Sequence, residues 1–334
     1  MTNNTDTCDK FIRTMTTKQN ELKSTQRVAF ADIARGLAVM YFVWCHTVDI
    51  HVAWVDTWAM PVFFVVMGMF FKPTATWREM AVKKTNTILV PFFLLSIPSY
   101  IQSAITMPVK DFFLKLVNPY ECVHGVGWFL ICIFCCYLIY YGVKRITKNS
   151  DRKTAVLCII VSVLNYYAST QRVMGYRILL PFFLSTSFTV LPFICIGDTL
   201  RGFIKKERSL ATDSISALIL VSCTFAGVYL LQFRGGEYIV HLFYGQSWLK
   251  VFFLSIMGTV SILALSKLLP RTMSYAGEHS LLLLMVHPYI IRVLNLFQLP
   301  PVAVFSITLV VTLILIGVLA HYFPVLEGKK RVFK

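Results

Sequence analysis

Three ionisable side chains interrupt an apolar stretch near the beginning of the sequence. Asp32, Arg35 and His46 lie within residues 28–48, and a helix with 100° per residue places them on one face, within about 60° of one another. Asp32 and Arg35 are three residues apart and can form an ion pair. His46 lies about 21 Å further along the helix axis. A neutral imidazole accepts protons near pH 7, so His46 is a candidate general base, with Asp32 orienting Arg35.

The same three residues also have an interpretation without chemistry. Asp32 and Arg35 could form an ion pair that only satisfies its own charges, and His46 could pack at the end of a helix. However, ionisable groups in apolar segments are costly and rare. Three of them on one face therefore favour a functional role.

A second polar face lies in the apolar segment 279–296. Ser280 and His287 are seven residues apart and share this face, about 10 Å from each other, which is too far for a direct Ser–His pair. Pro288 should loosen or kink the helix just after His287, and capping of that defect is an alternative role for the histidine. His279 is expected at the surface.

Other chemical motifs are weak or missing in the sequence. The histidines show no zinc-binding spacing, and neither a GxSxG elbow nor a phosphate-binding glycine loop occurs. Cys132, Cys135 and Cys136 line one side of a single apolar segment, where free cysteine behaves as a small hydrophobic residue. The sequence therefore predicts neither a metal site nor a disulfide.

The composition identifies the elements that must position these residues. Of 334 residues, 57% are hydrophobic and only 14% are charged, and the mean hydropathy is +0.67. Soluble domains carry about a quarter charged residues. This excludes a soluble globular enzyme, a disordered regulator and a disulfide scaffold. The net charge of +16 is better explained by basic loops of a membrane protein than by nucleic-acid binding. The predicted fold class is an all-α polytopic membrane protein.

About ten transmembrane helices are expected within one integral-membrane domain, residues 28–323. A polar tail, residues 1–27, precedes this domain and has no apolar core typical of a signal peptide, and a basic tail, residues 324–334, follows it. The third segment is long enough to suggest tilt or a break. The expected spans are 28–48, 56–72, 85–107, 126–143, 154–169, 178–200, 213–232, 250–267, 279–296 and 302–323.

Basic residues set the expected orientation. With the amino terminus in the cytoplasm, 24 of the 32 Lys and Arg residues fall on the cytoplasmic side and seven on the other, which predicts that both termini are cytoplasmic. Lys144, Arg145, Lys205 and Lys206 are interpreted mainly as charges that fix this topology. Lys83 and Lys84 open the third segment on the cytoplasmic side, where they could also meet an anionic ligand.

Five motifs, in order along the chain, resemble acyltransferase family 3, the integral-membrane O-acyltransferases that include fucose 4-O-acetylase-like proteins. The resemblance extends from Arg27 to the tenth segment. It rests on Phe30, Asp32, Arg35, Gly36 and His46; on Met60, Pro61, Val62, Phe63, Phe64 and Gly68; on Trp128, Phe129 and Leu130; on Leu191, Pro192, Phe193 and Gly197; and on Gly277, Ser280, Leu281 and His287.

Two positions depart from the family pattern. The basic pair before Pro91, Arg-x-x-Arg in the family, is Lys84 and Thr87 here, so the second cation is missing and Lys83 is its candidate replacement. The family's serine before the glycine of the second segment is Met67.

The resemblance implies transfer of an acyl group, most simply acetyl, from cytoplasmic acyl-CoA to a hydroxyl of a cell-envelope carbohydrate or lipid-linked saccharide. With this activity, we expect Arg35, Lys83 and Lys84 to bind the phosphates of acetyl-CoA and Trp128 to contact the acceptor. Ser280 and His287 are expected to line the acceptor side or to help hold the acyl carbonyl. The implied location is the bacterial inner membrane. The alternatives are a transporter or flippase for lipid-linked saccharides, in which the polar faces line a path, and an inactive sugar-binding partner. The lack of internal repeats disfavours the transporter.

Overall fold

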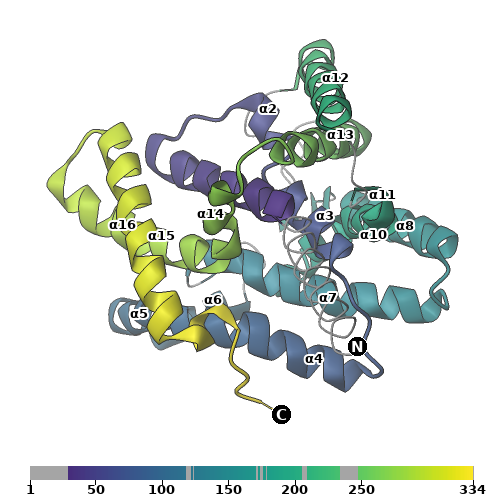
Figure 1. The fold of residues 1–334 in the computed structure, drawn as a ribbon. Helices are drawn as coiled ribbons and strands as arrows, with labels where there is room; N and C mark the ends of the chain where they lie inside the picture. The colour runs from purple at the N-terminus through teal and green to yellow at the C-terminus, as the bar shows by residue number, and fades with distance from the viewer. Residues whose placement is uncertain are drawn as a thin grey trace, which may run out of the picture.

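The computed structural model describes residues 29–117, 122, 124–170, 172–173, 176–177, 179–204, 209–233 and 247–333 (Figure 1). The expected amino-terminal tail and the pair Lys205 and Lys206 lie outside the described residues. Helices dominate the described part of the chain. A two-stranded antiparallel hairpin, β1 (Arg172–Val173) and β2 (Tyr176–Arg177), joins two of them, with Val173 paired to Tyr176.

The first helix covers residues 29–48 and carries the polar face of Asp32, Arg35 and His46. It is followed by α2 (Ala53–Asp56) and α3 (Pro61–Met69). Pro61 stands at the first position of α3, where its missing N–H leaves no intrahelical bond unmade. The second expected span is therefore two short helices rather than one continuous helix.

The third expected span is a helical stretch with a wider turn inside it. It consists of α4 (Trp77–Lys84), the π-helical turn η1 (Thr85–Leu89) and α5 (Val90–Thr106). Thr76 and Glu79 form a capping box at its beginning. Pro91 lacks the N–H that would bond the carbonyl of Thr87 in an α-helix, and the π turn lies directly before it. The segment in which tilt or a break was expected is thus a continuous helical stretch with one irregular turn.

The remaining helices follow in sequence order. They are α6 (Val109–Val117), η2 (Gly125–Gly127), α7 (Trp128–Ile146), α8 (Asp151–Thr170), α9 (Leu184–Thr189), α10 (Leu191–Thr199), α11 (Arg201–Ile204), α12 (Leu210–Leu230), α13 (Trp248–Ser266), η4 (Arg271–Ser274), α14 (Tyr275–Glu278), α15 (Ser280–Leu294), η5 (Asn295–Phe297), α16 (Pro301–Tyr322) and η6 (Pro324–Glu327).

Seven helices in the described ranges are long and apolar enough to cross a membrane. Two shorter apolar stretches, Ala53–Met69 and Leu184–Thr199, coincide with the second and sixth expected spans. Only 11% of the apolar part of α12 and 22% of that of α16 is buried inside the protein, so their large apolar side chains face outward, as lipid contact requires. The chain is a multi-pass membrane protein of the all-α class, with one short hairpin in its described part. The count of ten and the orientation of the termini stay predictions.

Glycines allow the closest helix contacts in the bundle. A Cβ atom on Gly68 of α3 would lie 1.9 Å from the carbonyl oxygen of Ile194, and one on Gly197 of α10 would lie 1.9 Å from that of Val65. A Cβ atom on Gly277 of α14 would lie 1.6 Å from the carbonyl oxygen of Asp32. The third contact holds the beginning of α15 against the first helix, which brings the two predicted polar faces together.

Candidate active site

The two histidines singled out in the sequence are hydrogen-bonded to each other. Nδ1 of His46 lies 2.9 Å from Nε2 of His287, and the two rings are nearly parallel, at an interplanar angle of 9°. Nδ1 of His287 in turn lies 2.9 Å from the carbonyl oxygen of Leu283, one turn earlier in α15. His287 is fully buried, whereas His46 is exposed at the end of the first helix.

This chain of contacts assigns the proton positions. A carbonyl oxygen can only accept, so Nδ1 of His287 carries a proton and donates to Leu283. Neutral His287 then accepts at Nε2, and Nδ1–H of His46 is the donor. In neutral His46 the unprotonated atom is therefore Nε2, the atom on the side of the ring away from His287. The arrangement prepares His46 to take up a proton.

His46 lines a cavity of about 280 Å³, here named the histidine cavity. Its polar lining includes Tyr41, Asp49, His51 and Asp56. The hydroxyl of Tyr41 donates to the buried carboxylate of Asp56 over 2.8 Å and accepts from a backbone N–H of the loop before α2. Nδ1 of His51 lies 3.5 Å from the same carboxylate. Carboxylates and hydroxyls of this kind can hold a polyhydroxylated ligand beside His46.

Sequence reasoning did not find Tyr41, His51 or Asp56. The available signal was Asp56, an acidic residue at the edge of an apolar segment, and Tyr41, five residues before His46 in the first helix. Trp128, which the resemblance places on the acceptor side, lines the histidine cavity next to Phe129.

A second cavity of about 280 Å³, here named the cation cavity, is lined by Arg35, Lys84, Thr87, Tyr137 and Ser280 together with apolar side chains. Lys84 lies over the ring of Tyr137, with Nζ 3.3 Å from the ring centre. Arg35 forms an ion pair with Asp32. The structure thus brings Arg35 and Lys84 together in one cavity.

Two other predicted residues take different places. Lys83 is exposed and does not line the cation cavity. Ser280, expected with His287 on the acceptor side or near the acyl carbonyl, lines the cation cavity, about two turns before His287 along α15. Pro288 does not end α15, which continues to Leu294.

The two cavities meet at two apolar side chains. Phe129 of α7 and Leu284 of α15 line both of them. Both side chains are buried. Phe129 and Leu284 therefore lie at the boundary between the two cavities, between Arg35 and His46.

A third histidine, His124, lies near the histidine pair and was not singled out in the sequence. His124, just before η2, is buried, and its Nε2 donates to the carbonyl oxygen of Met285 in α15 over 3.1 Å. Burial lowers the pKa of His124, because removal from water disfavours the charged ring. Neutral His124 therefore fastens the segment before α7 to α15 near His287.

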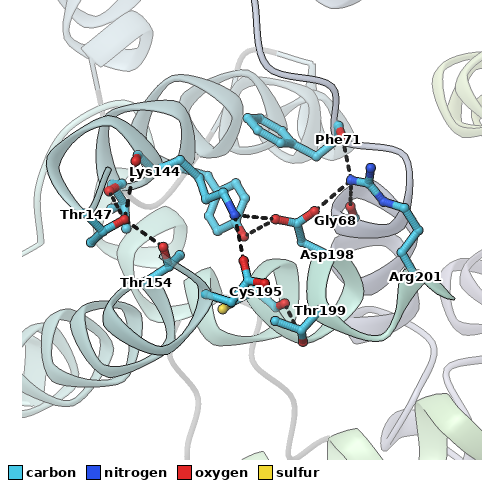
Figure 2. Close-up of polar contacts among 12 residues, drawn as sticks. Gly68, Phe71, Lys144, Thr147, Thr154, Cys195, Asp198, Thr199 and Arg201 are labelled. Atoms are coloured by element: carbon cyan, nitrogen blue, oxygen red, sulfur yellow. Dashed lines mark hydrogen bonds and ion pairs between the residues drawn. The ribbon is translucent and has the colours of Figure 1, made fainter. Parts of the chain in front are cut away.

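A separate polar network ties α3, α7 and α10 together (Figure 2). The carboxylate of Asp198 accepts from Tyr140 at 2.9 Å and forms ion pairs with Lys144 at 3.0 Å and Arg201 at 2.6 Å. Arg201 also donates to the carbonyl oxygen of Phe71, just after α3. Lys144 was interpreted as a topology charge, but its side chain is mostly buried in these ion pairs, so it also has a structural role.

Comparison with known families identifies a domain that includes the helices that line the two cavities. A family model described as an acyltransferase domain matches residues 28–321, from the first helix almost to the end of α16. The chain belongs to acyltransferase family 3. The resemblance found in the motifs is thereby confirmed, and the protein is a multi-pass membrane acyltransferase. No curated protein and no solved structure matches the chain.

Proposed function

We propose that this protein is a membrane O-acyltransferase that moves an acyl group, most simply acetyl, from acyl-CoA to a hydroxyl of a cell-envelope carbohydrate. The observation that carries the proposal is the hydrogen-bonded series Leu283–His287–His46, which leaves Nε2 of His46 free of a proton. An acyltransferase that uses a hydroxyl acceptor needs such a base.

The donor enters the cation cavity in this proposal. Arg35 and Lys84 are the cations that line it, and a thioester of coenzyme A carries phosphates that pair with such groups. The pantetheine arm is slim and largely uncharged. It can extend along the cavity towards Phe129 and Leu284, where the two cavities meet.

The acceptor occupies the histidine cavity. Asp49 and Asp56 can accept hydrogen bonds from sugar hydroxyls, and Trp128 offers an aromatic surface against which a sugar ring can pack. The reacting hydroxyl lies at Nε2 of His46.

The reaction needs one base that also serves as an acid. Nε2 of His46 takes the hydroxyl proton while the hydroxyl oxygen forms a bond to the thioester carbonyl carbon. The tetrahedral intermediate collapses, the carbon–sulfur bond breaks, and the thiolate of coenzyme A takes the proton from Nε2. His287 keeps Nδ1–H of His46 bonded throughout, so that the same nitrogen reacts in both steps.

The test uses the purified full-length protein in lipid vesicles with radiolabelled acetyl-CoA and a panel of saccharides. Release of free thiol and labelled saccharide are both measured. We expect transfer by the wild type and a loss of about 100-fold or more in His46→Ala. A fully active His46→Ala variant would refute the role of His46.

A transporter for lipid-linked saccharides is the competing function, because two cavities lined by polar residues could also belong to a path through the bundle. Movement of a labelled saccharide across the vesicle membrane without any use of acetyl-CoA would favour it. Mass spectrometry of envelope polysaccharide from cells with and without the gene would identify the acceptor.

A further inference from the structure

The carboxyl-terminal tail is fastened to the π-helical turn beside the cation cavity. The side-chain amide of Asn86, in η1, makes two hydrogen bonds as a donor and two as an acceptor. It donates to the carbonyl oxygens of Val82 and Phe333, each over 2.9 Å, and it accepts from the backbone N–H groups of Val332 at 2.7 Å and Phe333 at 2.8 Å. Asn86 is 1% exposed, so this is a buried clamp on the tail backbone. Figure 1 shows the yellow tail leaving α16 towards α4.

A second contact holds the beginning of the same tail. Gly328 has φ of +68°, and a Cβ atom there would lie 2.6 Å from the Cα atom of Thr87. Only glycine can make this approach in this backbone conformation. Thr87 itself lines the cation cavity. The tail is therefore fixed at both ends of residues 329–331, directly outside the cavity.

The buried carboxylate of Glu327 adds a third fastening point. It is bonded to Nδ1 of His279 and to Nζ of Lys329. His279 directly precedes Ser280, which lines the cation cavity. The tail thus contacts Thr87 of the η1 turn and His279, the residue before Ser280, so it lies beside two residues that line the cation cavity.

The fixed segment is basic and faces solvent. Residues 329–331 are Lys-Lys-Arg, and all three are exposed. Lys329 is paired with Glu327, whereas the structure shows no ion pair for Lys330 or Arg331 within the described ranges. Thr87 stands where the family pattern has a second basic residue, so this cavity lacks a cation at the position that the tail contacts.

The size of the donor requires contacts outside the cavity. Sites that bury a drug-sized ligand have volumes of roughly 300–1,000 Å³, and acyl-CoA is larger than such a ligand. The cation cavity, at about 280 Å³, can hold the acylated arm but not the nucleotide as well. The nucleotide half of a donor of this size therefore needs a surface next to the cavity, and the tail lies beside residues that line it.

We propose that Lys330 and Arg331 bind the phosphates of the nucleotide half of acyl-CoA, and that the tail supplies the cations that Thr87 does not. This inference rests on the proposed function. Residues 329–331 form a rim of the donor site that the clamp of Asn86 and the contact at Gly328 hold in place.

The test compares two donors in the full-length protein. Acetyl-CoA carries the phosphates, and S-acetylpantetheine carries the same thioester without them. In the double variant Lys330→Ala/Arg331→Ala, we expect KM for acetyl-CoA to rise about five- to tenfold at unchanged kcat, and kcat/KM for S-acetylpantetheine to stay the same. The matched control is Arg152→Ala/Lys153→Ala, which removes two exposed charges at the beginning of α8.

Four outcomes separate the possibilities. A selective loss of acetyl-CoA affinity in the tail variant, unlike the control, supports the proposal. Equal KM values in both double variants overturn it while leaving the acyltransferase function intact. An equal loss with both donors, seen in vesicles of phosphatidylglycerol but not of phosphatidylcholine, assigns the tail to lipid headgroups and also overturns it. A wild-type protein that neither binds coenzyme A in titration calorimetry nor transfers acetyl overturns the proposed function itself.

Discussion

Removal of the His287 imidazole tests whether His46 is a base held in one orientation. His287→Ala takes away the buried acceptor of Nδ1–H of His46, a hydrogen bond of 2.9 Å. We expect His46 to remain in place on the first helix but to lose its fixed ring orientation and its fixed tautomer. The chemical step should slow, while donor binding in the other cavity should not change.

The size of the effect follows from two contributions. A buried hydrogen bond contributes about 1 kcal/mol, which corresponds to about fivefold in rate if it is needed in the transition state. A released imidazole can also sample about six combinations of its χ1 and χ2 angles, of which one is productive. Together these give a decrease of about 30-fold in kcat, less than the loss expected for His46→Ala.

The assay is steady-state acetyl transfer by purified protein in vesicles, with kcat and KM determined separately. KM for acetyl-CoA should stay within about twofold of the wild type, because His287 does not line the cation cavity. His287→Gln, whose amide oxygen can accept from Nδ1–H, should recover part of the activity. Leu282→Ala is the control, because it removes a fully buried side chain of the same helix without removing a hydrogen bond.

Two results would refute this reasoning. If His287→Ala retained kcat within about twofold while His46→Ala was inactive, the hydrogen bond between the histidines would have no catalytic role. If Leu282→Ala lowered kcat as much as His287→Ala, the loss would come from packing of α15 and not from the orientation of His46.

Three further predictions concern the packing and the passage between the cavities. Asp198→Asn removes the carboxylate that pairs with both Lys144 and Arg201, and we expect it to lower the free energy of unfolding by about 2–4 kcal/mol in thermal unfolding. The control is Asp151→Asn. Asp151 is the exposed second partner of Lys144, so this change should cost less than about 1 kcal/mol. Gly277→Ala places a methyl group against the backbone of Asp32 and should destabilise the protein by about 2–3 kcal/mol, whereas Gly317→Ala, facing only the Tyr275 hydroxyl at 3.2 Å, should be nearly neutral in the same measurement. Leu284→Ala removes a side chain that lines both cavities, and we expect it to raise the preference for butyryl-CoA over acetyl-CoA about five- to tenfold in competition assays. Leu281 lines only the cation cavity of the two, and Leu281→Ala should leave this preference unchanged.

The positions of most helices, and the residues that share one face of a helix, could be predicted from the sequence. Hydropathy places the helices because each span needs a run of apolar residues, and the 100° step places Asp32, Arg35 and His46 on one face. The length of the third segment suggested tilt or a break, and the structure has a continuous helical stretch with a π-helical turn at Thr85–Leu89. These predictions depend only on neighbouring residues.

The partners of those residues could not be predicted, because they depend on how helices pack. His46 and His287 are 241 residues apart, and a helical wheel gives a face but not the residue opposite it. Ser280 was assigned to the acceptor side because it shares a face with His287. It lines the other cavity because α15 is long enough for its two ends to face different spaces.

The first helix and α15 each contribute side chains to both cavities, and under the proposed function this would couple the donor and acceptor sites. Arg35 and Ser280 line one cavity, and His46, with His287 behind it, belongs to the other. The histidine pair joins the two helices directly, and Gly277 of α14, just before α15, makes a close contact with Asp32 of the first helix. A slide of one helix along the other would break both contacts, so the distance between the cations and the base is fixed by helix packing. Under the proposed function, we therefore expect differences in acyl or acceptor specificity to come from side chains that line the cavities, such as Leu284 and Asp56, and not from movement of His46.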